Sequence, residues 1–131
     1  MRIWQLNQDL VSLKLSRFEL KIVTNSLEQV ILRISTRGFH SRLGVNYEHA
    51  KSFLGRIAKL ERRLCRQNLR TIEVCLNYDD LLLLNNVFNE VCHGIRIIGF
   101  ESKIGCERVV VENIFKSFKK STRSFFDSQD S

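Results

Sequence analysis

Three histidines and four cysteines are the residues best suited to catalysis or metal binding: His40, His49, His93, Cys65, Cys75, Cys92 and Cys106. None of the histidines has a serine or cysteine nearby in a recognised nucleophile context. Cys92 and His93 are adjacent, and neighbours on a helix point about 100° apart, so they cannot form a dyad by adjacency. No two cysteines have the CxxC spacing that is usual in structural zinc sites. We therefore predict no catalytic site, no cofactor, no metal site and buried, reduced cysteines.

Basic residues form the more informative pattern. Residues 1–65 contain twelve Lys/Arg against five Asp/Glu, whereas residues 66–131 contain nine of each, so the net charge of +7 belongs to the first half. A one-sided excess favours one face that binds a negative partner, although a solvated face without a partner fits it equally well. The candidate binding residues are the cations that crowd into residues 37–63: Arg37, Arg42, Lys51, Arg56, Lys59, Arg62 and Arg63. Arg56, Lys59 and Arg63 have helical spacing and are expected to form one stripe.

An internal repeat indicates which elements position these residues. Residues 11–57 align with residues 72–118 at one constant offset and without a gap, with nine identities in 47 pairs. The aligned segments GFHSRLG and GFESKIG place Phe39 on Phe100, and both are expected to be buried anchors. Because chance matches rarely keep one register, we interpret the chain as a duplication.

Each repeat has the pattern of a strand, a helix, a turn and a second helix. The alternation of Val11, Leu13 and Leu15 predicts a short strand, and Ser16 with Glu19 has capping-box spacing for the following helix. Asn77 with Asp80 is the equivalent cap in the second repeat. The opening residues MRIWQL are expected to add an edge strand, and residues 119–131 are expected to form a frayed polar tail.

The segment GFHSRLGVNYEHAKSF also has features of a helix-turn-helix around Gly44. Phe39, Leu43 and Ala50 would fill its inward positions, but His40 stands where a small residue is usual, four positions before the turn glycine. DNA binding is therefore the alternative function. It ranks second because two equivalent helix-turn-helix elements should both be basic, whereas the second repeat contains Glu101 and is neutral overall.

The segment LLLLNNVFNEVCHGIRIIGFESKIG resembles small, mostly uncharacterised bacterial proteins with an LLNN-x-x-NE-x-C core and a following F-x-x-[RK]-[LI]-G segment. These are loosely associated with immunity proteins that neutralise toxins. The matching residues are Leu83, Leu84, Asn85, Asn86, Asn89, Glu90, Cys92, Gly94, Phe100, Lys103 and Gly105. The resemblance covers the second repeat and implies a cytosolic, non-enzymatic binding protein, without naming a site. Asn86 is expected to hydrogen-bond within the protein, because Asn25 stands at the same position of the first repeat. Glu90 has no charged counterpart in the first repeat and is expected to have a role in the second repeat only.

The sequence thus predicts a helix-rich α+β fold with a small shared sheet, in which two β-α-turn-α units pack around a pseudo-twofold axis. Residues 1–131 are expected to form one domain, either a monomer with pseudo-dimer symmetry or a weak homodimer. The expected function is that of a cytoplasmic, non-catalytic binding protein whose basic first repeat contacts an acidic protein surface, such as a toxin domain, and no membrane. Whether Asn85, Asn89 and Glu90 are structural or functional stays open.

Overall fold

Residues 1–129, which the computed structural model describes, form an α+β fold with a three-stranded antiparallel sheet. The elements in chain order are β1 (Arg2–Gln5), β2 (Val11–Ser16), α1 (Arg17–Arg33), α2 (Thr36–Leu43), α3 (Tyr47–Arg66), β3 (Thr71–Leu76), α4 (Tyr78–Asn89), the π-helical turn η1 (Glu90–Gly94), α5 (Phe100–Ile104) and α6 (Arg108–Gln129). The predicted fold class is confirmed.

The sheet has the order β1-β2-β3, so β1 is the edge strand expected from the opening residues. In the register of β2 with β3, Leu13 is opposite Val74. Leu13 and Val74 belong to the buried rows of their strands, whereas Glu73 and Cys75 of β3 are exposed. The alternation of apolar and polar residues in β3 therefore turns one face of the sheet to the helices and the other to solvent.

Both helices that follow a strand begin at the predicted caps. The Ser16 side chain accepts a hydrogen bond from the Glu19 backbone N–H, and the Glu19 carboxylate accepts one from the Ser16 N–H. Asn77 and Asp80 form the same reciprocal pair at the start of α4. Each pair satisfies backbone donors that have no partner within the helix.

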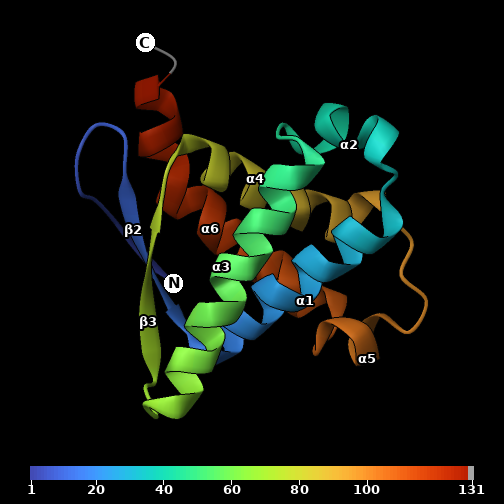
Figure 1. The fold of residues 1–131 in the computed structure, drawn as a ribbon, viewed down its shortest axis with the longest axis horizontal. Helices are drawn as coiled ribbons and strands as arrows, with labels where there is room; N and C mark the ends of the chain where they lie inside the picture. Colours follow the sequence, from blue (N-terminus) through green and yellow to red (C-terminus); the bar gives the residue numbers. More distant parts are fainter. Residues whose placement is uncertain (130–131) are drawn as a thin grey trace.

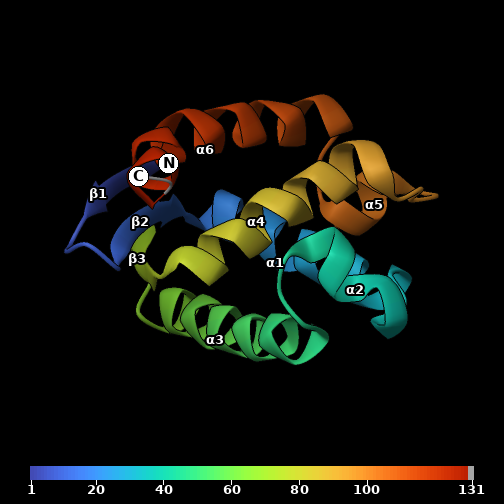
Figure 2. The same cartoon turned by 90° about the horizontal axis from the view of Figure 1, so that it is seen from above.

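The helices lie in layers around a central pair (Figure 1). Seen from above, α1 and α4 occupy the middle, α3 flanks them on one side and α6 on the other (Figure 2). The sheet closes one end of this arrangement, and α2 and α5 lie at the opposite end (Figure 2). The core is filled by buried apolar residues from all layers, including Phe39, Phe53, Phe88 and Phe118.

The elements recur along the chain at the offset of the sequence repeat, which places residue 11 on residue 72. We call two positions equivalent when this offset relates them. The equivalent of α1 is residues 78–94, which is the span of α4 and η1, and the start of α6 at Arg108 is equivalent to the start of α3 at Tyr47. In the sheet, the opposed pair Leu13 and Val74 is itself an equivalent pair. The second half departs from this offset in several places: β3 lies one residue earlier than the equivalent of β2, η1 is π-helical, α5 is shorter than α2, and α6 ends two residues later than the equivalent of α3.

Two amides link the halves reciprocally. The Asn25 side chain donates to the Ile104 carbonyl oxygen at 2.8 Å, and the Asn86 side chain donates to the Leu43 carbonyl oxygen at the same distance. The two donors are equivalent, and so are the two acceptors. The internal role expected for Asn86 is therefore present, although it ties α4 to the other half of the chain. That residues 11–57 and 72–118 superpose as one duplicated unit stays a prediction.

Two sequence expectations need correction. Residues 119–129 are not a frayed tail, because α6 continues to Gln129 and buries Thr122 and Phe125, which keep the helical spacing of Phe118 despite the polar residues between them. Residues 130–131 of the expected tail lie outside the described residues. Phe100 is not a buried anchor, because it is only half-buried beneath the Arg108 guanidinium, whereas Phe39 is fully buried.

Candidate functional site

Two of the seven predicted binding residues form ion pairs with other residues of the same chain. Arg42 of α2 forms an ion pair with Glu90 of η1, and Arg56 of α3 forms one with Asp80 of α4. Both carboxylates are buried, with 7% of Glu90 and 2% of Asp80 exposed. Because a buried carboxylate needs a partner, these two arginines first serve the fold. Arg56, Lys59 and Arg63 are all exposed at the helical spacing of the predicted stripe, but Arg56 is already paired, and the binding role of the stripe stays a prediction.

Glu90 meets Arg42 across the boundary between the two halves. The Arg42 Nε donates to Glu90 Oε2 at 3.0 Å, and Arg42 Nη2 donates to Glu90 Oε1. The hydrogen bond to Glu90 raises the pKa of Arg42 above its ordinary value. A Cβ at Gly94 would meet the Glu90 carboxylate, so a larger residue there would require the Glu90 side chain to move. The sequence suggested that Glu90 acts in only one of the two repeats. In the structure Glu90 makes a structural contact with Arg42.

Asp80 collects contacts from two elements besides its own helix. His49 Nε2 lies 3.0 Å from Asp80 Oδ1, and Arg56 donates both to the Asp80 carboxylate and to the Cys75 carbonyl oxygen. The Arg56 guanidinium also lies over the Phe53 ring. This cluster joins α3 to the start of α4 and to the end of β3. It resembles a catalytic dyad only in its His–Asp pair, because Asp80 is already occupied as a helix cap.

The exposed face of α3 carries a cluster of basic residues. Ala50, Phe53, Ile57 and Leu64 are the buried residues of α3. The opposite face exposes five cations, namely Lys51, Lys59, Arg62, Arg63 and Arg66. Within residues 1–129, none of the five lies within ion-pair distance of a carboxylate. We call these five residues the α3 basic face.

Arg66 was missed by the sequence analysis, which counted cations only as far as Arg63. Its signal was present, since Lys59, Arg62 and Arg66 are three and four residues apart and so share one side of a helix. Gly55 also lies on this exposed side, and a Cβ there would meet nothing within 4 Å. The backbone of α3 is therefore open to close approach at the centre of the basic face.

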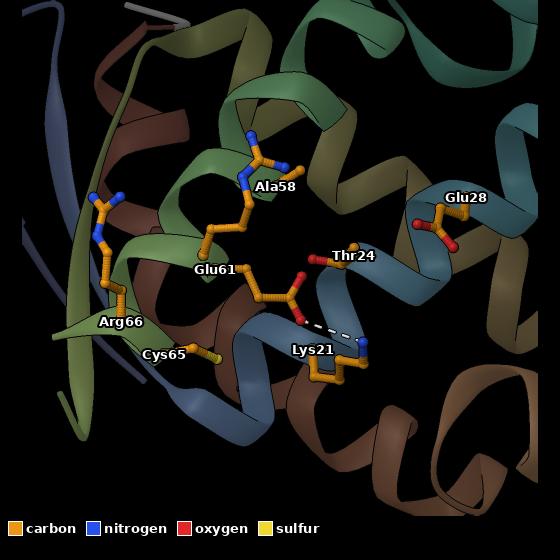
Figure 3. Close-up of a pocket in the computed structure, with 8 residues that line it drawn as sticks. Lys21, Thr24, Glu28, Ala58, Glu61, Cys65 and Arg66 are labelled. Carbon is orange, nitrogen blue, oxygen red and sulfur yellow. Dashed lines mark ion pairs between the residues drawn. The ribbon is translucent and has the colours of Figure 1, made fainter. Parts of the chain in front are cut away.

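An open groove runs beside this face, between α1 and α3 (Figure 3). Its volume is about 650 Å³, and Lys21 of α1 reaches across it to Glu61 of α3 with Nζ 3.3 Å from Oε1. The residues that line the groove are Lys21, Thr24, Glu28, Ala58, Glu61, Arg62, Cys65 and Arg66. Arg62 and Arg66 thus belong both to the α3 basic face and to the groove wall.

The α2–turn–α3 segment has part of the expected helix-turn-helix geometry. Gly44 ends α2 in the left-handed conformation, and Phe39, Leu43 and Ala50 are buried as the motif requires. His40 is exposed, however, and so does not sit against the second helix. Arg37, the remaining predicted residue, lies exposed near the start of α2, away from the α3 basic face.

The cysteines and acids show no catalytic or metal-binding arrangement within the described residues. In that part of the chain, no group of three or more His, Cys, Asp or Glu side chains is placed to hold a metal ion. Cys92 and Cys106 are buried as expected, but Cys65 and Cys75 are exposed. Burial raises the pKa of the Cys92 thiol to about 11, which opposes formation of the reactive thiolate.

No helix within residues 1–129 combines the length and the apolar character needed to cross a bilayer. No protein-family model, no curated protein and no solved structure matches the chain. The described geometry and the charge of the α3 basic face are therefore the observations on which a function can be based.

Proposed function

We propose that this chain is a non-catalytic binding protein whose α3 basic face contacts an acidic surface of another protein. The observation that carries the proposal is that all five cations of this face are exposed and lack a carboxylate partner among residues 1–129. Arg42 and Arg56, by contrast, already have partners. A toxin domain acting in the cytoplasm is the class of partner that the sequence resemblance suggests.

The physical argument is one of electrostatic complementarity. Five like charges on one helix repel one another in the free protein, and an acidic partner relieves that repulsion. Such a surface speeds encounter and selects against basic partners more than it adds affinity, and salt weakens it. The exposed backbone at Gly55 allows a partner to come close between Lys51 and Lys59. The groove wall adds Arg62 and Arg66 as side-chain donors that can bind a carboxylate in a bidentate manner.

DNA binding is the second candidate, favoured by the left-handed turn at Gly44 between α2 and α3. Two observations rank it lower. His40 is exposed, whereas the motif usually has a small residue packed against the second helix at that position. The cations of the α3 basic face also stand mainly in the second half of α3, whereas a recognition helix reads base edges with its N-terminal residues.

The test compares two double charge reversals that change the net charge equally. Lys59→Glu with Arg62→Glu alters the α3 basic face, and Arg96→Glu with Lys103→Glu alters exposed cations that lie outside it. Binding of a short poly-Glu peptide and of a short DNA duplex is measured by fluorescence anisotropy at low and at physiological ionic strength. We expect the first variant to bind the peptide about five- to thirtyfold more weakly than the wild type, since each exposed ion pair contributes up to about 1 kcal/mol.

The matched control is expected to stay within about twofold of the wild type, because general charge acts weakly through screened solvent. Equal losses in the two variants would contradict a specific role for α3. A duplex that binds much more tightly than the peptide, with a steep logarithmic dependence on salt, would replace the proposal by the DNA-binding alternative.

A further inference from the structure

The outer side of α6 is basic as well, although the second half of the chain is neutral in total. Lys116, Lys119, Lys120 and Arg123 are all exposed, and two acids bound them on the same side of the helix, Glu112 four residues before Lys116 and Asp127 four residues after Arg123. The ammonium of Lys119 lies over the Phe115 ring, 4.4 Å from its centroid, which is closer than the 5.6 Å between Lys51 of the α3 basic face and the Tyr47 ring, so we leave Lys119 out. We call the other three cations, Lys116, Lys120 and Arg123, the α6 basic face.

Two cations of this face are the equivalents of cations in α3. Lys120 is equivalent to Lys59, and Arg123 is equivalent to Arg62. Both pairs fall beyond the aligned ranges 11–57 and 72–118, so the same offset continues in the helices themselves. Because α3 and α6 begin at equivalent positions, the two pairs also stand at equal distances along their helices.

The contacts between the halves place the two helices in matching surroundings. Leu13 and Val74 face each other in the sheet, and the amides of Asn25 and Asn86 make reciprocal contacts. The predicted pseudo-twofold axis, which would exchange these pairs, would also exchange α3 with α6, and these two helices flank the central pair of helices on opposite sides (Figure 2). One short segment therefore cannot cover both faces, because α1 and α4 lie between them.

We propose that the α6 basic face is a second binding surface for the same acidic chemistry, so that one chain binds two copies of its acidic partner. This inference rests on the function proposed for α3. Lys120 and Arg123 would contact the second copy as Lys59 and Arg62 contact the first, in the manner of a symmetric dimer whose two subunits each bind one partner.

The two surfaces differ in strength, and the side chains beside them explain why. The α3 basic face has five cations and an open groove at its side, whereas the α6 basic face has three cations. The equivalents of the groove residues Glu61 and Cys65 are the buried Thr122 and the half-buried Phe126. The first copy therefore binds more tightly than the second.

The experiment measures how many copies of a short poly-Glu peptide bind to one chain, with a peptide too short to reach from α3 to α6. The equivalent variants are Lys59→Glu with Arg62→Glu and Lys120→Glu with Arg123→Glu, and the control is Arg96→Glu with Lys103→Glu. Isothermal titration calorimetry and native mass spectrometry give the stoichiometry. Circular dichroism melting checks that each variant is folded, which is expected because all six positions are exposed.

We expect two unequal sites in the wild type and in the control. The α6 variant should lose the weaker site and keep the tighter one, and the α3 variant should lose the tighter site and keep the weaker one. One peptide per wild-type chain, or two undiminished sites in the α6 variant, would overturn the inference. If instead the α3 variant keeps both sites while the α6 variant loses one, the function proposed for α3 fails and the α6 basic face alone remains.

Discussion

The α1/α3 side and the α4/α6 side of the molecule begin from the same pairing of helices and end with different surfaces. On the first side, α3 presents Ala58, Glu61 and Cys65 toward α1, and these short or polar side chains leave an open groove. On the second side, the equivalent positions of α6 are Lys119, Thr122 and Phe126.

Two of these positions have larger side chains on the second side, Lys119 and Phe126, whereas Thr122 is smaller than Glu61. Thr122 is buried and donates to the Phe118 carbonyl oxygen, and the Phe126 ring packs edge-on against Tyr78 at 5.6 Å between centroids. The first side thus has an open groove, and the second side has an aromatic contact in its place. The difference shows that the shared core determines where the helices lie, whereas the residues at the rim decide what each side can bind.

The largest expected effect concerns two equivalent phenylalanines. Phe39 is fully buried and packs edge-on against Tyr47, so Phe39→Ala should lower the free energy of unfolding by about 3–5 kcal/mol. Phe100 is half-buried, and Phe100→Ala should lower it by only about 1–2 kcal/mol. Urea denaturation of the two variants measures both values. Equal losses would mean that the two sides have equivalent anchors despite their unequal burial.

A medium effect is expected at the ion pair that joins Arg42 to Glu90. Arg42→Gln leaves the Glu90 carboxylate buried without its partner and should lower the free energy of unfolding by about 1–3 kcal/mol. The matched control is Lys103→Gln, because Lys103 is equivalent to Arg42 and exposed, and the equivalent of Glu90 is the uncharged Gln29. Its change should stay within about 0.5 kcal/mol. A loss as large for Lys103→Gln would show that charge, rather than the pair with Glu90, stabilises this end of the molecule.

The smallest effect is chemical and leaves stability unchanged. Cys65 lines the open groove and Cys75 is exposed, so both should react with iodoacetamide in the folded protein at about pH 8. Cys92 and Cys106 are buried with raised pKa values, so under the same conditions they stay as neutral thiols that react slowly. Mass spectrometry should therefore find two labels on the native chain and four after denaturation. Rapid labelling of Cys92 or Cys106 would indicate that the second side opens readily.

Much of the local structure could be predicted because it depends on neighbouring residues. The capping boxes at Ser16 and Asn77 and the alternation of β3 are patterns within a few residues, and each is present. The tail was misjudged for a related reason. Phe125 stands among polar residues and looks solvated in sequence, but α6 packs Phe125 into the core.

The sequence by itself determined the α+β class and the concentration of cations in residues 37–63. Only the tertiary structure decided which of those cations are available, because their partners are distant in the chain. Arg42 meets Glu90 at a separation of 48 residues and Arg56 meets Asp80 at 24, whereas Lys59, Arg62 and Arg66 meet no carboxylate within residues 1–129. A count of charges treats every cation in the same way. A buried carboxylate, however, needs a charged partner, so it pairs with the arginine that the fold places beside it.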